Sequence, residues 1–339
     1  MIKKFLKILK ARNSSPYMIA EIGNNHNGSV KLAKQLIIEA KKCGADCVKF
    51  QTFSTKSLFS KKSFIKNKKL KYQSDKYTLD LKTFKTLKNF AKKQKIEFTA
   101  TPFSKLEVDF LVNTLKIKLI KIASMDLNNY PLIDYIAKKK LPIIISTGFG
   151  SKIEIKKAIS ILKRNKAKFI ILHCVSEYPP NNKNLNLLRI KEFEKIFSCP
   201  VGFSDHTIGT LTSITALALG AKVIEKHFTL NKKMEGWDHS ISADPKELRQ
   251  LCNYGKDVNK LKGSKKIFRV EQKKNLLLFR RSIVASKELS KNKKILFSDL
   301  DFKRPGTGLE PIDWKKIVGK RLNKKVLYDD QISLKDIKK

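Results

Sequence analysis

Short apolar, β-rich runs alternate with amphipathic stretches of helical period eight times along this chain. A strand followed by a helix, repeated, predicts parallel strands covered by helices, and eight repeats predict an α/β protein with a (β/α)8 TIM barrel. The alternative is a doubly wound open sheet, but Gly23–Gly28 after the first run lacks the G-x-G-x-x-G spacing of dinucleotide-binding sheets. The expected strands are 17–21, 46–50, 96–100, 119–123, 142–146, 169–173, 200–204 and 222–226.

The C-terminal part of the chain has a different character from the repeats. We expect a barrel domain over 1–262, a charged linker over 263–278 and a small β-rich domain over 279–339. In that last domain the sequence predicts strands at 282–285 and 325–327 and a short helix at 313–318. Within the barrel, the lysine- and serine-rich segment 53–77 is expected to be a surface loop over the barrel mouth.

The charge of the chain is strongly positive, with a formal net charge of +43 for 339 residues. Only nine of the basic residues are arginines and 64 are lysines. Proteins that read bases or phosphates rely on the bidentate fork of arginine, and these lysines are spread over nearly every expected helix surface. We therefore expect no specific nucleic-acid partner, although the positive field will attract anionic substrates.

Targeting and redox signals favour the cytoplasm. No run of 18 apolar residues is present, so no membrane segment is expected. The basic, apolar start Met1–Lys10 is interrupted by lysines and lacks a small-residue cleavage site, which argues against a signal peptide. Five scattered cysteines without a pairing framework indicate free thiols in a reducing compartment.

Polar side chains follow the expected strands at their ends, the edge on which barrel enzymes carry their active sites. Glu21 closes the first strand, and Lys49 and Lys121 interrupt the second and the fourth. A single lysine of this kind is usually a surface residue, but two in one barrel are better interpreted as ligands for an anion. Hydroxyl groups that would add to a phosphate or carboxylate site are those of Thr99, Thr101, Ser124, Ser146, Thr147 and Ser204.

Two histidines end consecutive expected strands, His206 after the seventh and His227 after the eighth. Because these strands become neighbours in a parallel barrel, the two imidazoles form a candidate divalent-metal site. The simpler interpretation is two hydrogen-bonded histidines at strand ends. The other three histidines, His26, His173 and His239, also fall near the same expected rim, and Glu225 adds a further titratable group there. Asp205, next to His206, should point the other way and need not bind metal.

An ordered set of short motifs runs through nearly the whole chain, together with two more in the tail. The chain resembles the sialic acid synthase family (N-acetylneuraminate synthase-like), in which a barrel is followed by an antifreeze-like (SAF) domain. The motifs that carry the resemblance are 19–29, 48–52, 101–104, 121–124, 145–148, 203–207 and 224–228 in the barrel, and 280–283 and 303–308 in the tail.

The resemblance implies a transferase that condenses phosphoenolpyruvate with the open aldehyde form of an N-acetylated hexose, such as N-acetylmannosamine. The product would be a nine-carbon 2-keto sugar acid, with release of phosphate. It also implies a divalent metal held by His206 and His227, typically Mn²⁺, with Mg²⁺ or Co²⁺ as alternatives. Legionaminic and pseudaminic acid synthases are alternatives within the same family. From another class, a non-catalytic binding protein or a non-specific nucleic-acid binder stays open.

The family resemblance also assigns roles to single residues. Glu21 would act as acid/base or position water, Tyr178 and Asp238 would hold the sugar, and Asp126 would contact it. Arg304 would reach the N-acetyl side from the SAF domain of a partner subunit, which implies a domain-swapped homodimer. Phosphoenolpyruvate would be held by Lys49, Thr101, Lys121, Ser124, Ser146 and Ser204.

Two positions depart from the family pattern. Asp126 stands where these synthases tend to have glutamate, and Trp237 replaces the proline of a glycine-proline-aspartate motif. Both positions adjoin the expected sugar site, so the identity of the sugar is left open by the sequence.

Overall fold

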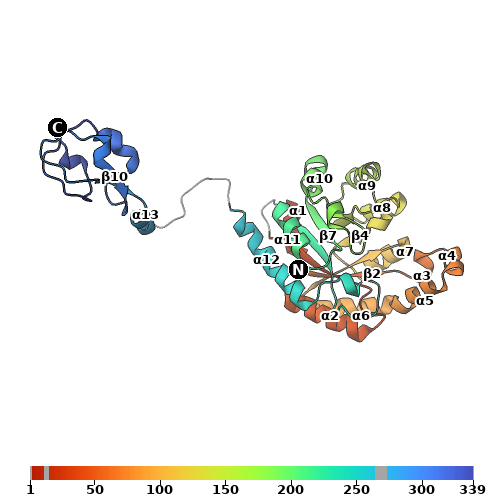
Figure 1. Cartoon of the computed structure of the whole chain (residues 1–339). Helices are drawn as coiled ribbons and strands as arrows, with labels where there is room; N and C mark the ends of the chain where they lie inside the picture. The colour runs from red at the N-terminus through yellow and green to blue at the C-terminus, as the bar shows by residue number, and fades with distance from the viewer. Residues whose placement is uncertain (1, 11–14, 264–272, 339) are drawn as a thin grey trace. The chain divides into compact units, whose positions relative to one another are not determined.

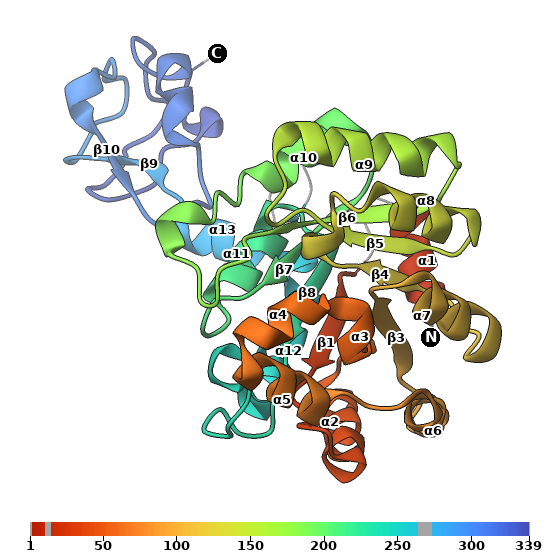
Figure 2. The same cartoon turned by 90° about the vertical axis from the view of Figure 1, so that its right-hand side faces the viewer.

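The computed structural model describes residues 2–10, 15–263 and 273–338. The chain divides into two compact units, Met1–Gly263 and Ser264–Lys339. In the first unit, eight parallel strands form a near-closed ring with helices on its outside (Figure 1, Figure 2). The hydrogen-bonded order is β3-β2-β1-β8-β7-β6-β5-β4. The strands are β1 (Tyr17–Gly23), β2 (Cys47–Thr52), β3 (Glu97–Pro102), β4 (Ile120–Ile122), β5 (Ile143–Ser146), β6 (Phe169–Cys174), β7 (Val201–Asp205) and β8 (Val223–His227).

The predicted barrel is therefore confirmed, and each expected strand lies within two residues of an observed one. The ring closes between β3 and β4 through a side chain, since the Thr99 hydroxyl donates to the Leu119 carbonyl at 2.6 Å. One main helix follows each strand. These helices are α2 (Val30–Cys43), α6 (Leu81–Lys93), α7 (Lys105–Asp109), α8 (Tyr130–Lys138), α9 (Lys152–Arg164), α10 (Arg189–Phe197), α11 (Leu211–Leu219) and α12 (Pro245–Leu261).

Local signals set the ends of helix α2. The Ser29 hydroxyl accepts a hydrogen bond from the Leu32 amide, as expected for an N-cap. Gly44 ends the helix in the left-handed region at φ 95°, where a side chain would be strained. The buried face of the helix repeats at helical spacing and packs on the outer side of the strands.

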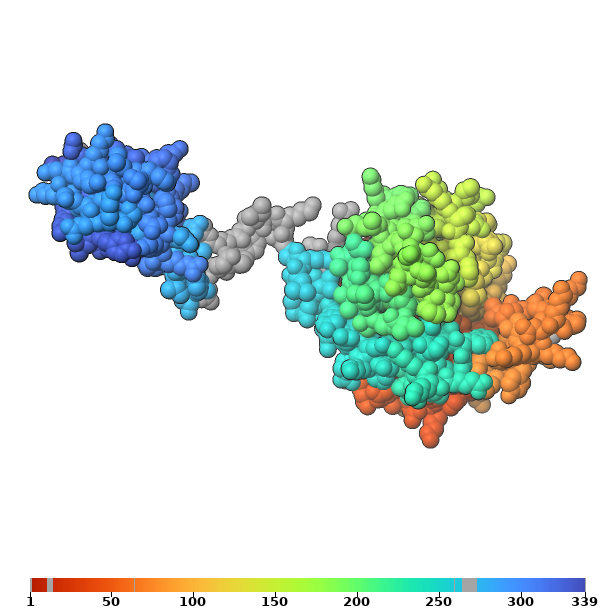
Figure 3. Space-filling view, in the orientation of Figure 1, coloured from red at the N-terminus to blue at the C-terminus, as the bar shows by residue number. Residues whose placement is uncertain are grey.

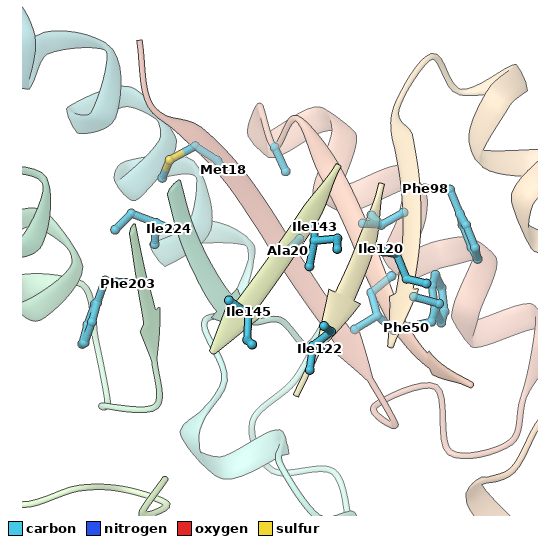
Figure 4. Packing of buried hydrophobic residues seen from close by; sticks show 14 of the residues in the cluster. Met18, Ala20, Phe50, Phe98, Ile120, Ile122, Ile143, Ile145, Phe203 and Ile224 are labelled. Atoms are coloured by element: carbon cyan, nitrogen blue, oxygen red, sulfur yellow. The ribbon is translucent and has the colours of Figure 1, made fainter. Parts of the chain in front are cut away.

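Side chains along the strands alternate between two apolar layers, because successive residues of a strand point to opposite faces. The outer layer, between strands and helices, contains Met18, Ala20, Phe50 and Ile224 (Figure 4). The inner layer fills the N-terminal half of the barrel with Tyr17, Ile19 and Val223, among others. The inner positions at the carboxyl ends of the strands are polar instead, and they form the site described below.

Helix α1 (Ile2–Lys10) closes the N-terminal end of the barrel. Its Phe5 and Ile8 are buried in the same cluster as the inner apolar layer, and Phe5 meets Tyr17 edge-on with ring centroids 5.3 Å apart. The Lys4 ammonium pairs with Asp46 at 2.5 Å. The barrel is thus apolar and closed at this end, and its chemistry is confined to the other.

The segment 53–77 is helical, which corrects the expected surface loop. It forms α3 (Thr55–Leu58), α4 (Lys61–Lys66) and α5 (Lys68–Tyr77), which project from the barrel in orange in Figure 3. Ser54 and Asn67 cap α3 and α5, and the Thr55 hydroxyl donates to Asp75 at 2.6 Å. Lysine is a good helix former and the segment has neither glycine nor proline, so its composition was misread as a loop signal.

The second unit has its own small core, built around Ile283, Leu289, Ile317 and Ile332. Strands β9 (Ser282–Ala285) and β10 (Leu300–Lys303) form an antiparallel pair, which confirms the first expected strand. The strand expected at 325–327 is reduced to one bridge between Val326 and Leu289. The helix expected at 313–318 is a 3₁₀ segment, Pro311–Lys316.

Helix α13 (Lys273–Phe279) occupies the end of the expected linker 263–278. Residues 264–272 of that linker lie outside the described residues. Among the helices described, none is both long and apolar enough to cross a membrane.

Candidate active site

A cavity lies at the carboxyl ends of the barrel strands. Ten of the side chains predicted for the site line it together: Glu21, Lys49, Thr101, Lys121, Ser124, Ser146, Tyr178, Ser204, His206 and His227. They come from strands β1 to β8 and the loops that follow them. The structure therefore brings into one space residues that are up to 206 positions apart in the sequence.

Strand alternation explains why lysines are buried here. Val48 and Phe50 point to the outer apolar layer, so Lys49 between them must point into the barrel. Ile120 and Ile122 place Lys121 inside by the same rule. A buried ammonium group needs a compensating charge, and two carboxylates in the same interior supply it.

The four charged side chains form one connected cluster. The Lys49 ammonium lies 2.8 Å from Glu21 Oε2 and 3.7 Å from Glu225 Oε1. The Lys121 ammonium lies 3.2 Å from the same Glu225 oxygen. The Ser204 hydroxyl also donates to Glu225 Oε1 at 3.0 Å, and Lys49 donates to the Thr101 hydroxyl at 3.2 Å.

Burial and the mutual charges of the cluster shift the pKa values of its members. Burial raises the pKa of Glu21 to about 7, against the opposing charge of Lys49. Burial also acts upward on the pKa of Glu225, but Lys121 and Lys49 outweigh it and the pKa is lowered. The pKa of Lys121 is lowered by burial, which Glu225 opposes. One carboxyl group can thus exchange a proton near neutral pH while its neighbour stays ionised.

Several buried polar atoms around the cavity have no hydrogen-bond partner within the described chain. They are Glu21 Oε1, Glu225 Oε2, Ser146 Oγ and His227 Nδ1. Buried polar atoms in native proteins are nearly always satisfied, so unsatisfied ones at a cavity indicate a place for a ligand or water. Such a ligand could donate hydrogen bonds to the carboxylate oxygens and accept one from the Ser146 hydroxyl.

His206 and His227 face the cavity from neighbouring strand ends, with ring centroids 5.5 Å apart. Nδ1 of His206 lies 2.8 Å from the Val175 carbonyl, and the Tyr178 ring stacks on the His206 imidazole at 4.1 Å. The carboxylate of Asp238 lies 3.7 Å from His227 Nδ1. The Val175 carbonyl and the Tyr178 ring therefore hold the His206 imidazole in place, whereas Nδ1 of His227 has no hydrogen-bond partner among the described residues.

The two imidazoles suit a divalent cation. Burial, with His206 and Lys49 nearby, holds the pKa of His227 well below its usual value, so this ring is neutral as a ligand must be. Burial also acts downward on the pKa of His206, but Cys174 and the Val175 carbonyl outweigh it and the pKa is raised, so this ring must lose its proton when a cation binds. A backbone carbonyl at the second ring nitrogen is also a common support for a metal-binding histidine. The described residues contain no group of three or more His, Cys, Asp or Glu side chains arranged for a metal. The protein therefore offers two nitrogen donors, and the remaining positions would fall to water and substrate.

The other three histidines do not line the cavity, although His26 and His239 lie in the loops that follow β1 and β8, at the same end of the barrel. His26 is buried against Phe50 and accepts a hydrogen bond from the Gly28 amide at 3.0 Å. His173 Nε2 lies 2.6 Å from the Leu185 carbonyl, on the outer side of its strand. His239 is held between Thr229 and Asn27.

Five predicted residues do not line the cavity. The hydroxyls of Thr99 and Thr147 donate instead to the carbonyls of Leu119 and Leu172, at 2.6 Å and 3.2 Å. Asp126 lies just beyond Ser124 in the turn after β4, and Asp238 lies behind His227. Burial raises the pKa of Asp126, and burial raises that of Asp238 to about 6. Arg304 is exposed in the second unit, where its guanidinium lies 5.5 Å from the centre of the Phe279 ring.

The sequence-based selection missed Cys174 and Gln51, which also line the cavity, and it gave Glu225 no role beyond that of a titratable group near the rim. The missing signal was the two-residue period of the strands. Glu225 precedes His227 by two positions and Gln51 follows Lys49 by two, so each pair shares a face.

Comparison with known proteins identifies the family of this chain. The model of the NeuB family matches residues 36–267, and that of the SAF domain matches residues 280–338. The chain belongs to the NeuB family. Members named as synthases of N-acetylneuraminate 9-phosphate and of pseudaminic acid are 36% and 34% identical to it.

Relatives from distant organisms match this NeuB protein over nearly its whole length. An uncharacterized protein of Methanocaldococcus jannaschii is 42% identical over 93% of this chain and 91% of its own. The N,N'-diacetyllegionaminic acid synthase of Campylobacter jejuni is 40% identical, covering 93% and 98%. A crystal structure of N-acetylneuraminic acid synthetase from Leptospira borgpetersenii has a TM-score of 0.72 at 36% identity, covering 78% of this chain and 90% of that chain.

Proposed function

We propose that this NeuB protein condenses phosphoenolpyruvate with the open-chain aldehyde of an N-acetylated hexose. The enol carbon of phosphoenolpyruvate attacks the aldehyde carbon, water adds to the resulting cationic carbon, and the C–O bond to phosphate breaks. The products are a nine-carbon 2-keto sugar acid and inorganic phosphate. The observation that carries the proposal is the single cavity in which two buried lysines, several hydroxyls, a carboxyl of raised pKa and two imidazoles converge.

Each group has a distinct part in this reaction. Lys49 and Lys121, with the Thr101, Ser124, Ser146 and Ser204 hydroxyls, bind the phosphate and carboxylate of phosphoenolpyruvate. Glu21, with a pKa of about 7, gives or takes a proton as the carbonyl is consumed and water adds. Tyr178 and Asp238 orient the sugar beside the two histidines.

We also propose that His206 and His227 bind a divalent cation, typically Mn²⁺, with Mg²⁺ or Co²⁺ as alternatives. When bound, such a cation supplies Lewis-acid polarisation of the sugar aldehyde. The donor set fits, since the two rings face each other with centroids 5.5 Å apart, the Val175 carbonyl holds that of His206, and the lowered pKa of His227 keeps its ring neutral. The resemblance adds a swapped homodimer in which Arg304 of one subunit completes the sugar site of the other.

The identity of the sugar is the second question, and one observation bears on it. Asp126 Oδ2 is buried without a hydrogen-bond partner, and the side chain is one methylene shorter than the glutamate that the family pattern favours. Asp126 does not line the cavity, however, so its length does not by itself select the sugar. Relatives named as N,N'-diacetyllegionaminic acid synthases, 40% and 38% identical to this chain, favour a sugar with an additional acetamido group. A diacetamido hexose, the precursor of a legionaminic or pseudaminic acid, is therefore the alternative to N-acetylmannosamine.

A phosphate-release assay tests the proposal. Phosphoenolpyruvate and Mn²⁺ are supplied with N-acetylmannosamine, its 6-phosphate, and 2,4-diacetamido-2,4,6-trideoxyhexoses in turn. One of these sugars should give sugar-dependent phosphate release together with a new 2-keto acid detected by mass. Phosphate release that does not depend on any sugar, or no release at all, contradicts the proposed condensation.

A further inference from the structure

A second charged pair lies on the outer face of β7 and β8, directly behind the two histidines. Asp205 and Lys226 are cross-strand partners in the β7–β8 ladder, and Asp205 Oδ2 lies 3.2 Å from the Lys226 ammonium. Their side chains are 0% and 1% exposed, and neither lines the cavity. Each is the immediate neighbour of a candidate metal ligand, Asp205 of His206 and Lys226 of His227.

Asp205 is saturated with hydrogen bonds. Its Oδ1 accepts from the Thr207 amide at 2.8 Å and the Thr207 hydroxyl at 2.7 Å. Its Oδ2 accepts from the Ser213 hydroxyl at 2.5 Å in addition to facing Lys226. The carboxylate thus joins the end of β7, the turn after His206 and helix α11 to strand β8.

Lys226 completes the same network from the other strand, because its ammonium also donates to the Thr207 carbonyl. The other carboxylate that acts on Lys226 is Glu247 of α12, which is paired with Lys232 at 2.5 Å. Asp205 is therefore the direct counter-ion of Lys226. The turn that carries His206 is held by both members of the pair.

A fully buried ion pair is a weak source of stability, because the cost of removing two charges from water offsets much of their attraction. Apolar residues of similar size often replace such pairs without loss of stability. A role in fixing geometry explains its presence better here, since the pair spans the two strands whose ends must present two imidazoles at one point. Because Asp205 and Lys226 point outward, the same strand period directs His206 and His227 inward.

We propose that the Asp205–Lys226 pair is a positioning device for His206 and His227, which sets the affinity of the site for a divalent cation without contacting the cation. The inference rests on the proposed metal site. A hydrogen bond from an outer residue commonly orients a single metal-binding histidine. The Asp205–Lys226 pair would orient two histidines at once, because it links their two strands. The two rings, with centroids 5.5 Å apart, are set by the register and spacing of β7 and β8 at their last residues.

The test measures cation affinity in Lys226→Met, Asp205→Asn and the double variant. Methionine keeps most of the length and apolar volume of lysine, and asparagine keeps the shape of aspartate. Free Mn²⁺ is followed by electron paramagnetic resonance during titration of the full-length protein, and thermal unfolding is recorded without metal. Each single variant should bind Mn²⁺ about tenfold or more weakly, the usual cost of losing an outer support of a metal ligand. The double variant should lose little more than either single one, because both remove the same contact.

Thr99→Val is the matched control for stability. It removes a buried hydrogen bond between β3 and β4, two strands that carry neither histidine, so it should lower the unfolding temperature without changing Mn²⁺ affinity. If the charge variants fail to fold, Ser213→Ala removes one hydrogen bond to Asp205 without changing any charge. It should still weaken Mn²⁺ binding more than Thr99→Val does.

The outcomes separate this inference from the proposed metal site. Wild-type protein that binds no Mn²⁺, or a His206→Ala variant that binds it normally, contradicts the metal site itself. Wild-type binding that is lost in His206→Ala but kept in folded Lys226→Met and Asp205→Asn overturns the positioning role. An equal loss of affinity in Thr99→Val would also overturn it, because the effect would then follow stability alone.

Discussion

Lys49 and Lys121 are compensated by carboxylates before any substrate arrives. Both approach the same oxygen of Glu225, and Lys49 has a second partner in Glu21. An anion that enters the cavity must share these ammonium groups with the two carboxylates. The loss of either lysine should therefore weaken binding of the anion. When the cavity holds no anion, the two carboxylates compensate the charges of the lysines.

Loss of either lysine should mainly weaken the binding of phosphoenolpyruvate. We expect Lys49→Met and Lys121→Met each to raise its KM, since a hydrogen bond to a charged group contributes about 1.5–3 kcal/mol, roughly a ten- to hundredfold effect. Steady-state kinetics at saturating sugar measure this, with circular dichroism as the check on folding. Unchanged KM values in both variants would remove these lysines from the anion site.

Loss of either imidazole should remove both the cation and the activity. His206→Ala and His227→Ala are expected to fold, because the rings lie at strand ends and not in an apolar layer. Turnover should be abolished, and Mn²⁺ titration should show no tight site. A variant that regains near wild-type turnover after chelation and metal repletion contradicts the two-histidine site.

Glu21 should make stability depend on pH in a defined direction. Its folded pKa, about 7, lies above the ordinary value of 4.5, so the folded protein holds a proton that the unfolded chain releases. The stabilisation from that proton is complete below pH 4.5 and is lost as the pH rises through 7. In Glu21→Gln this loss is absent, so the variant should gain stability relative to wild type between pH 5 and pH 8, by on the order of 3 kcal/mol. Chemical denaturation at the two pH values measures the difference, and a constant difference would contradict the raised pKa.

At the scale of elements, Trp237 in the loop after β8 contacts helix α5. The Trp237 indole nitrogen donates to Gln73 at 3.3 Å, and the indole meets the buried Tyr77 ring edge-on at 5.1 Å. Asp238, the next residue, lies beside His227. Trp237, one of the two positions at which this chain departs from the family pattern, thus joins the inserted helices to the edge of the site.

Trp237→Ala should release helix α5. We expect faster amide hydrogen exchange across Lys68–Tyr77, because the helix loses its main aromatic contact with the barrel. Hydrogen exchange with mass detection measures this. Tyr72→Ala is the control, since Tyr72 is on α5 but 68% exposed, and it should leave exchange near the wild-type level. Equal exchange in wild type and Trp237→Ala would show that other contacts hold the helix.

At the scale of the whole molecule, each unit has a separate apolar core, so the barrel should fold without the SAF domain. A protein ending at Gly263 keeps the eight strands and both histidines, and we expect it to bind Mn²⁺ but to be inactive, because Arg304 is missing from the proposed sugar site. Mn²⁺ titration and the phosphate-release assay measure the two properties. Full activity of this shortened protein would remove the SAF domain from the reaction.

Mixing two inactive full-length variants tests whether Arg304 acts across a dimer. His206→Ala supplies an intact SAF domain, and Arg304→Ala supplies an intact barrel. Mixed dimers should regain activity at one of their two sites, with subunit exchange followed by mass. Exchange without any recovered activity would contradict the cross-subunit role.

The barrel and the position of its site could be read from the chain because they depend on local patterns. Strand runs, helical periods and caps such as Ser29 act over a few residues, and the carboxyl ends of parallel strands must meet. Lys49, Lys121, His206 and His227 could therefore be placed on one rim before their neighbours were known. The same local reasoning failed at 53–77, where lysine-rich composition suggested a loop although the helices are capped and free of glycine and proline.

Only the tertiary structure decided which charged side chains interact with one another. Glu225 contacts Lys49 and Lys121, each more than a hundred positions away in the sequence, and also Ser204. The raised pKa of Glu21 results from burial, which no local sequence pattern indicates. The outward pair of Asp205 and Lys226 likewise arises from the β7–β8 register. Sequence determines which face of a strand a residue takes, because that depends on backbone geometry alone. Its electrostatic partner depends on three-dimensional closure, because Coulomb interactions act through space and strengthen where water is excluded.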